Sequence, residues 1–288
     1  MTSAPAPGSV LIVTGASSGI GLATAVAAAQ AGFTVVATVR DLARSSALVD
    51  AAAAAAVEVD VRRLDVIDQK SVRACVGGVM ESYGRIDALV NNAGAAHVST
   101  LELDTLEEVR ATLEVNFFGV VAMSRETLPH LRASGGRLVA VTSVGGVIGQ
   151  PFNEAYCAAK FAVEGYLEAL APVAATVGVR VSVIEPGAVA SAFVANAGLD
   201  PEAMLAAAGP YAPALAAYLE RTAGAFAHAQ SSDDAAAVVV DTLLAANPAL
   251  RVQTSDSARA FVSVKLADLT GHAVQDITGG WVTAPETA

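Results

Sequence analysis

The stretch VLIVTGASSGIG, residues 10–21, decides the fold of this chain. Its first part, residues 10–14, is a short apolar run of the composition typical of a buried β-strand. A turn of glycine and serine follows, and then an alanine-rich helical stretch runs to about Ala31. A strand that enters a helix through a glycine turn is the first half of a βαβ unit.

The same alternation continues along the chain. Apolar runs predict further strands at 34–39, 57–66, 86–92, 136–143, 179–185 and 250–253, and helices are expected at 41–55, 68–83, 105–133, around Tyr156 and after Asp233. Alternating strands and helices predict a parallel sheet, and near-continuous apolar strands are typical of a sheet buried on both sides. We therefore expect an α/β fold, a Rossmann-type doubly wound parallel sheet with helices on both faces.

The domain organisation is predicted to be simple. Residues 1–9 read as a flexible leader, and no linker divides residues 10–288, so we expect a single domain. Residues 187–232 are rich in Ala, Gly and Pro and interrupt the alternation. We expect them to form a loop and short helices that cover a site.

Composition narrows the function classes. With 54% hydrophobic and 16% charged residues, the chain can bury a large core, but it contains no apolar run of the roughly 18 residues needed to span a bilayer. The net charge of −11 argues against a nucleic-acid partner. Cys75 and Cys157 match no metal spacing, nor do the histidines, so we expect no metal and a reduced, cytoplasmic protein.

The glycine turn points to a nucleotide. Gly15, Gly19 and Gly21 lie between the first strand and the first helix, where backbone approaches a pyrophosphate and the helix start offers free N–H groups. Their spacing is GxxxGxG and not the general dinucleotide pattern GxGxxG. A tight turn that needs glycine for its backbone and packing is the alternative.

Arg40 favours NADP(H) over NAD(H). It directly follows the strand at 34–39, where NAD-binding proteins usually carry an acid for the ribose hydroxyls. A guanidinium there suits a 2′-phosphate, and the Ser18 hydroxyl would add a contact. Asp41 is expected to cap the next helix and not to face the phosphate.

Further motifs lie at the ends of the predicted elements: LDV (64–66), NNAG (91–94), EVNFFG (114–119), Ser143, a YxxxK pair at Tyr156 and Lys160, and a PG turn at 186–187. With TGASSGIG (14–21), they resemble the short-chain dehydrogenase/reductase family in the same order over roughly residues 10–195. The stretches ATVRDL (37–42), 143–165 and SAF (191–193) are most similar to its 17β-hydroxysteroid dehydrogenase and retinol dehydrogenase branch.

The resemblance implies a set of cofactor contacts. They are Gly15, Ser17, Ser18, Gly19, Ile20, Gly21, Arg40, Asp65, Val66, Asn92, Ala93, Gly94, Tyr156, Lys160, Pro186, Gly187, Val189 and Ser191. Within this set Asp65 would contact the adenine. Ser191 replaces the family's usual threonine, which holds the nicotinamide carboxamide, and it retains a hydroxyl.

Tyr156 and Lys160 are one helical turn apart in AYCAAKFAVEG (155–165). Taken alone, such a pair is usually structural, a packing ring beside a surface charge. As a pair they suit acid–base chemistry, because a tyrosine has a pKa of about 10 and a nearby ammonium would lower it. The resemblance adds Ser143, which would donate to the substrate oxygen, and Asn116, which would hold a helix distortion and a water beside Lys160.

The sequence thus predicts an NADP(H)-dependent oxidoreductase. The branch implies a secondary alcohol and ketone, or an aldehyde, on a bulky apolar substrate such as a steroid or retinoid-like compound. The alternative is a catalytically silent NADP(H)-binding sensor of the same fold. The Tyr–Lys spacing disfavours an enoyl reductase, and the glycine spacing disfavours a nucleotide-sugar epimerase.

Four expectations concern other parts of the chain. The helices carrying Asn116 and Tyr156 pair across a two-fold in many family members, which implies a homodimer or homotetramer. Pro172 is expected to kink or end the second of these helices. Phe193 and Val194 are candidates for an apolar pocket, and Trp281 is expected to pack or lie in an interface.

Overall fold

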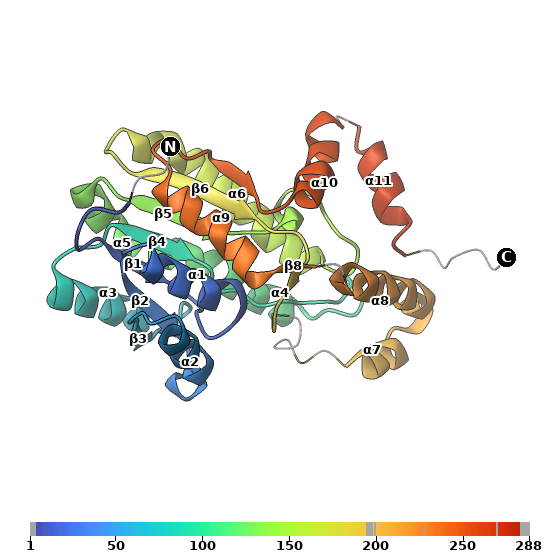
Figure 1. The fold of residues 1–288 in the computed structure, drawn as a ribbon. Helices are drawn as coiled ribbons and strands as arrows, with labels where there is room; N and C mark the ends of the chain where they lie inside the picture. The colour runs from blue at the N-terminus through green and yellow to red at the C-terminus, as the bar shows by residue number, and fades with distance from the viewer. Residues whose placement is uncertain (1–3, 194–197, 199, 228, 269, 283–288) are drawn as a thin grey trace.

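A seven-stranded sheet forms the centre of the computed structural model, which describes residues 4–193, 198, 200–227, 229–268 and 270–282 (Figure 1). All neighbouring strands are parallel, and their order is β3-β2-β1-β4-β5-β6-β9. The chain winds outward from β1 in one direction and from β4 in the other, which confirms the predicted doubly wound α/β fold. The strands are β1 (Val10–Val13), β2 (Thr34–Val39), β3 (Asp60–Arg63), β4 (Ala88–Asn91), β5 (Arg137–Val141), β6 (Arg180–Glu185) and β9 (Arg251–Gln253).

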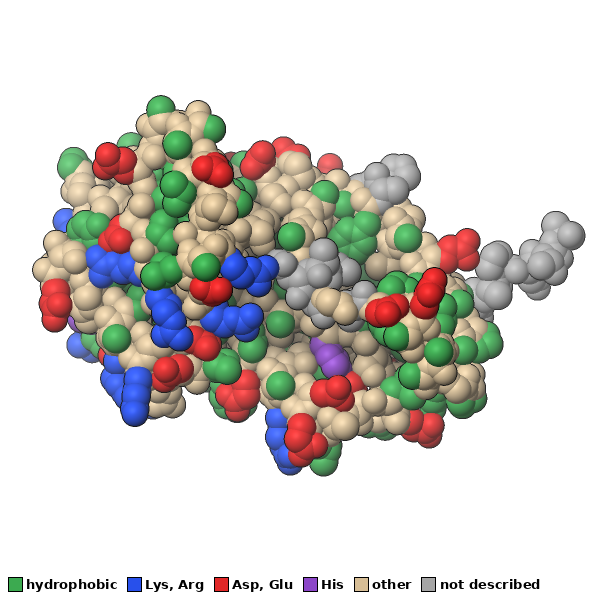
Figure 2. All heavy atoms as spheres, turned by 90° about the horizontal axis from the view of Figure 1, so that it is seen from below, with side chains coloured by type: hydrophobic (Ala, Val, Ile, Leu, Met, Phe, Trp, Pro, Cys, Tyr) green, Lys and Arg blue, Asp and Glu red, His purple; other side chains and the backbone are tan. Residues whose placement is uncertain are grey.

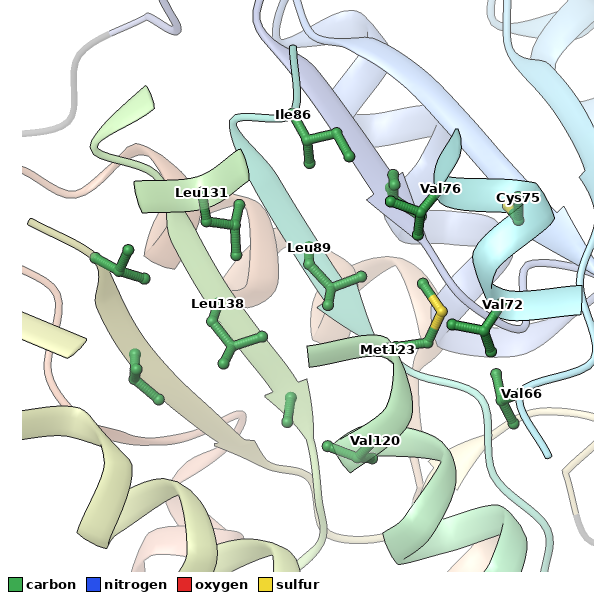
Figure 3. Packing of buried hydrophobic residues seen from close by; sticks show 14 of the residues in the cluster. Val66, Val72, Cys75, Val76, Ile86, Leu89, Val120, Met123, Leu131 and Leu138 are labelled. Atoms are coloured by element: carbon green, nitrogen blue, oxygen red, sulfur yellow. The ribbon is translucent and has the colours of Figure 1, made fainter. Parts of the chain in front are cut away.

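Helices cover both faces of this sheet. One face carries α1 (Gly19–Gln30), α2 (Ser46–Ala54) and α9 (Ser232–Leu244), and the other carries α3 (Gln69–Tyr83), α5 (Gly119–Ser134) and α6 (Glu154–Ala175). In Figure 3, Val76 of α3 and Met123 of α5 pack near Leu89 of β4, and Val120 lies near Leu138 of β5. These side chains are buried, so the sheet is apolar on both sides as predicted.

The helix predicted at 105–133 is interrupted. It begins at α4 (Leu106–Leu113) with a capping box, in which Thr105 and Glu108 bond each other's backbone N–H groups. One π-helical segment, η2 (Glu114–Phe118), follows and leads directly into α5. The π turn contains the buried Asn116, so the sequence expectation of a distortion at this residue is confirmed.

Two element ends differ in detail from the sequence-based expectation. Pro172, expected to kink or end its helix, lies near the end of α6, which stops at Ala175. A proline removes one backbone hydrogen bond, and this position lies in the last turn of a long helix, where little helix remains to be disrupted. The strand expected over 57–66 is only Asp60–Arg63, the part that pairs with Val36–Val39 of β2.

The segment after β6 is more helical than expected. Its two ends are joined where β7 (Val189–Ala190) pairs in parallel with β8 (Gln230–Ser231). Between them lie α7 (Pro201–Ala207), η5 (Gly209–Tyr211) and the long helix α8 (Ala212–Ala227). Residues 194–197, 199 and 228, which include Val194, lie outside the described residues.

The C-terminal part forms two helices, α10 (Asp256–Ala267) and α11 (His272–Gly279), which the sequence did not allow us to predict. They lie with α7 and α8 at one end of the molecule, beyond the ends of the strands (Figure 1). A separate apolar cluster joins this end, with Leu215 and Tyr218 of α8 packed near Phe152 and Trp281. In the described part of the chain, no helix combines the length and hydropathy needed to cross a membrane.

Candidate active site

The predicted site residues gather at one edge of the sheet. They follow the carboxyl ends of six strands: the glycine turn after β1, Arg40 after β2, Asp65 and Val66 after β3, Asn92 to Gly94 after β4, Ser143 after β5, and Pro186 and Gly187 after β6. Carboxyl ends of parallel strands lie at the same edge, and the strand order reverses between β1 and β4. This is where doubly wound sheets bind their ligands.

The glycine turn is locked to the loop after β4. Asn92 donates from its side-chain amide to the carbonyls of Thr14 and Gly15, at 3.0 Å each. The Thr14 hydroxyl accepts the backbone N–H groups of Asn92 and Ala93 at 2.9 and 3.0 Å. Gly15 has φ +69°, and a Cβ there would lie 2.7 Å from the Ala93 Cα, so only glycine permits this approach.

The start of α1 suits a phosphate. Gly19, Ile20 and Gly21 are its first residues, and the side chain of Ser18 at the N-cap position makes no capping hydrogen bond. The first turn contains no acidic residue that would repel an anion. Ser191 lies against this turn, because a Cβ on Gly19 would approach the Ser191 Cβ to 3.1 Å. The residues present therefore fit a pyrophosphate, with Ser191 near it.

The residues expected near the adenosine of the cofactor follow β2 and β3. Arg40 is exposed, and among the described residues it forms no ion pair. The Asp41 carboxylate accepts the Ala43 N–H at 3.0 Å and caps the short helix η1 (Leu42–Arg44), as predicted. Asp65 is half-buried, and its carboxylate accepts the Ile67 N–H at 3.3 Å. Asp41 is thus occupied locally, which leaves Arg40 as the charged group at this strand end.

Lys160 and Asn116 are held by backbone groups. The Lys160 ammonium is buried and donates to the Val141 carbonyl at 3.1 Å, at the end of β5. The Asn116 amide donates to the carbonyls of Thr112 and Ala95 at 3.0 Å, and its oxygen accepts the Ala95 N–H at 3.2 Å. A Cβ on Gly94 would lie 2.9 Å from the Asn116 Oδ1 and 3.6 Å from the Lys160 Nζ. The three residues therefore surround one small space.

Ser143 and Tyr156 form the opposite side of this group. The Ser143 hydroxyl accepts the Gly145 N–H at 2.9 Å and hydrogen-bonds Tyr156. The Lys160 Nζ lies 5.7 Å from the centroid of the Tyr156 ring. The four residues predicted as catalytic, which are spread over residues 116 to 160, are thus brought together.

Burial dominates the electrostatics of the pair. It raises the pKa of Tyr156 well above its ordinary value, and the hydrogen bond with Ser143 opposes that rise. It lowers the pKa of Lys160 to about 8, against the opposing influence of the Glu164 carboxylate. Burial is the largest influence on the pKa of Tyr156, so this side chain is a neutral phenol near neutral pH. The lowering of its pKa by Lys160 that the sequence predicts stays a prediction.

Aromatic side chains border the site on the side of the covering segment. The Phe193 ring lies 6.1 Å from that of Tyr156, and Phe152 lies 5.5 Å from Tyr218 of α8. Trp281 packs at 5.6 Å on Phe261, as its predicted packing role requires.

His97 and the two cysteines are not part of this group of four residues. The His97 Nε2 lies 2.7 Å from the Asp104 carboxylate, in the loop after β4. Cys75 and Cys157 are free, buried thiols, and burial raises the pKa of each to about 11. No group of three His, Cys, Asp or Glu side chains placed to hold a metal occurs in the described ranges.

One neighbour of the tetrad was missed from the sequence. Glu164 lies one turn beyond Lys160 on α6 and is buried, with its carboxylate 2.6 Å from the Thr142 hydroxyl. The signal was present, because a carboxylate at i+4 from a lysine lies on the same helix face. Sequence alone gave no reason to place that face inside the protein.

Comparison with known proteins shows the family. The family model described as short chain dehydrogenase matches residues 9–202, and the chain belongs to this family. It is 40% identical over 250 residues to mouse 17-beta-hydroxysteroid dehydrogenase type 1, covering 84% of this chain and 72% of the relative. It is 36% identical over 283 residues to bovine retinol dehydrogenase 8, covering 93% and 88%.

Among solved structures, a short-chain dehydrogenase from Streptomyces avermitilis matches with a TM-score of 0.74 at 30% identity, covering 97% of each chain. The fold, the family and the hydroxysteroid and retinol dehydrogenase branch predicted from sequence are thus confirmed. The protein is an oxidoreductase of a family that acts on CH–OH and C=O groups with nicotinamide cofactors.

Proposed function

We propose that the protein interconverts a secondary alcohol and a ketone, or an aldehyde, with NADP(H). The observation that carries the proposal is the meeting of Tyr156, Lys160, Ser143 and Asn116 at the carboxyl edge of the sheet. When bound, the nicotinamide cofactor supplies or accepts the hydride.

Each of these four residues either transfers a proton, hydrogen-bonds the substrate oxygen or holds a neighbouring group in position. In reduction, the Tyr156 hydroxyl gives its proton to the substrate oxygen, and its raised pKa favours this neutral form. Ser143 donates a hydrogen bond to the same oxygen and stabilises its developing charge. Lys160 would return a proton to Tyr156 and hold the nicotinamide ribose, and Asn116 fixes the π turn.

The preference for NADP(H) is proposed from charge. Figure 2 shows Lys and Arg side chains grouped on the side of the surface that carries β2 and β3 in Figure 1, with acidic side chains among them. Arg40, Arg44 and Arg63 are exposed at the ends of these strands and in η1. Guanidinium groups there favour a 2′-phosphate over a bare ribose hydroxyl.

The membership in the short-chain dehydrogenase family supports the full set of cofactor contacts expected from the sequence. We assign them to Gly15, Ser17, Ser18, Gly19, Ile20, Gly21, Arg40, Asp65, Val66, Asn92, Ala93, Gly94, Tyr156, Lys160, Pro186, Gly187, Val189 and Ser191. Residues 10–288 would work as one dinucleotide-binding and catalytic domain, and 187–232 would cover the substrate.

We further propose a bulky, apolar substrate. The relatives named as 17-beta-hydroxysteroid and retinol dehydrogenases support this class, and so does the Phe193 ring, 6.1 Å from that of Tyr156. A homodimer or homotetramer is supported by large apolar side chains exposed on α6 and on η2, namely Phe118, Tyr166 and Val173. Sedimentation of the purified protein tests the oligomer.

The test of the function is a spectrophotometric screen. Wild type is assayed on steroid and other apolar ketones, with NADPH against NADH, beside Tyr156→Phe. We expect turnover with NADPH, and in the variant a loss of about 100-fold or more in kcat with NADPH affinity retained. Equal turnover in the variant would exclude the proposed chemistry, and wild type that binds NADPH but turns over no carbonyl would favour the silent sensor.

The cofactor preference has its own variant. Arg40→Gln should lower the preference for NADPH by about tenfold, since a charge-assisted hydrogen bond contributes roughly 1.5–3 kcal/mol. Arg110→Gln is the matched control, because Arg110 is an equally exposed arginine on α4 that pairs with Glu107. A wild-type preference for NADH would overturn the assignment of Arg40.

A further inference from the structure

A buried charge cluster lies directly behind the catalytic lysine. Glu164 of α6 and Glu185 of β6 are both buried, and they face one guanidinium, that of Arg251 on β9. The Arg251 Nε lies 3.3 Å from the Glu164 Oε2 and 3.6 Å from the Glu185 Oε1, while its outer nitrogen pairs with the exposed Glu168 at 2.8 Å. Carboxylates are rarely buried without a reason in their surroundings.

Glu164 lies against residues on both sides of Ser143. Its Oε1 accepts the Thr142 hydroxyl at 2.6 Å, one residue before the serine. A Cβ on Gly146, three residues after the serine, would lie 3.0 Å from the Glu164 Cγ. The carboxylate thereby braces the end of β5, whose Val141 carbonyl receives the Lys160 ammonium.

The same carboxylate acts on Lys160 through space. The two residues are one turn apart on one helix face, and Glu164 favours the charged form of the lysine. The charged groups that face Glu164 are Lys160 and Glu168 from its own helix, Glu185 from β6 and Arg251 from β9. Its own pKa is raised to about 7, by burial first and by Glu185 as well, so Glu164 is ionised over the range in which Lys160 loses its proton.

We propose that Glu164 is a positioning residue of the active site: held by Thr142 and Arg251, it keeps the Lys160 ammonium charged and the Ser143 strand end in place. The proposal rests on the function proposed above for Lys160. It adds a carboxylate behind the lysine as part of the acid–base device, which then runs from Tyr156 through Lys160 to Glu164.

The test is the alkaline limb of two pH profiles, that of kcat and that of NADPH affinity. In Glu164→Gln the ammonium loses its negative neighbour, so the pKa of Lys160 falls and both limbs should move down by roughly one pH unit. Glu168→Gln is the matched control: it also removes a carboxylate from Arg251, but Glu168 is exposed, and both limbs should stay at their wild-type positions. Glu164→Asp keeps the negative charge, so both limbs should lie close to their wild-type positions.

Two results would overturn the proposal: limbs of Glu164→Gln that coincide with wild type, or an equal shift in Glu168→Gln. If Glu164→Gln does not fold, Thr142→Val decides. That variant loses the hydrogen bond that lowers the pKa of Glu164, so a smaller shift in the same direction is expected, and no shift would reject the idea. Because NADPH affinity is read separately from turnover, an enzyme inactive on every ketone would count against the proposed function and leave this test intact.

Discussion

At the scale of single residues, Gly94 shows how little room the site has. A Cβ on this residue would press against the Asn116 Oδ1 at 2.9 Å and approach the Lys160 Nζ to 3.6 Å. Neither neighbour can move easily, because the asparagine makes three hydrogen bonds to backbone and the lysine is buried against the Val141 carbonyl. The glycine is required by its neighbours, since its own φ is not in the left-handed region.

Gly94→Ala should therefore disturb both catalytic neighbours. We expect a loss of stability of about 1–3 kcal/mol from overpacking and a fall in kcat/KM of about tenfold or more. Gly77→Ala is the matched control, because Gly77 is exposed on α3 with nothing within 4 Å of a Cβ, and alanine there should stabilise by about 0.5–1 kcal/mol. Chemical unfolding and steady-state kinetics measure the pair. Wild-type activity in Gly94→Ala would contradict the tight contact.

At the scale of elements, the π turn in the long helix decides where Asn116 points. A regular helix from Leu106 onward would carry its backbone bonds without interruption. Here the asparagine amide takes up the Thr112 carbonyl and reaches across to Ala95 in the loop after β4. The segment therefore joins the α4–α5 helix to the loop that borders Lys160. Such single-turn π segments are frequent at functional sites.

Asn116→Ala should remove the side-chain contacts between the π turn and the loop after β4. The Ala95 N–H and the carbonyls of Ala95 and Thr112 lose their side-chain partner, and we expect a destabilisation of about 2–3 kcal/mol together with a loss of kcat. Thr112→Val serves as the control, because it removes only a hydroxyl bond to the Glu108 carbonyl at 2.9 Å. Thermal unfolding and turnover are compared for both. If the two variants lose the same activity, the junction has no special part in the site.

At the scale of the whole molecule, two distant segments close one end. Helix α8 belongs to the segment that connects β7 with β8. The C-terminal helices α10 and α11 lie at the same end of the molecule (Figure 1). Trp281 joins them: its ring stacks on Phe261 of α10, and the Arg221 guanidinium of α8 lies 4.6 Å from its centroid. The proposed cover over the substrate is thus held by residues about 60 positions apart in sequence.

Trp281→Ala should loosen the cover and leave the cofactor site unchanged. We expect the KM for a bulky apolar ketone to rise about tenfold, because burying such a ring contributes roughly 1.5–3 kcal/mol to the closed arrangement. The Kd for NADPH and the kinetics on a small ketone are the internal controls. A rise in the Kd for NADPH of the same size would show that the C-terminal segment supports the whole site and not its cover.

Much of this fold could be predicted from the sequence alone. The apolar run before TGASSGIG and the alternation of strands and helices after it predict a doubly wound sheet, because hydrophobic periodicity and glycine turns are local properties. The oxidoreductase activity was implied by the resemblance of the motifs to a known family, and not by the YxxxK spacing taken alone. The order of Asn116, Ser143, Tyr156 and Lys160 carried the family in the same way.

Tertiary structure alone decided the energetics of that site. The sequence pairs Tyr156 with Lys160, but only the packing shows that Lys160 is buried and Tyr156 partly buried, so that burial is the largest influence on both pKa values. Glu164 was visible one turn beyond the lysine, yet Thr142, Glu185 and Arg251 reach it from three different strand ends. Periodicity along a helix identifies which side chains share a face, and only the fold determines what that face is buried against.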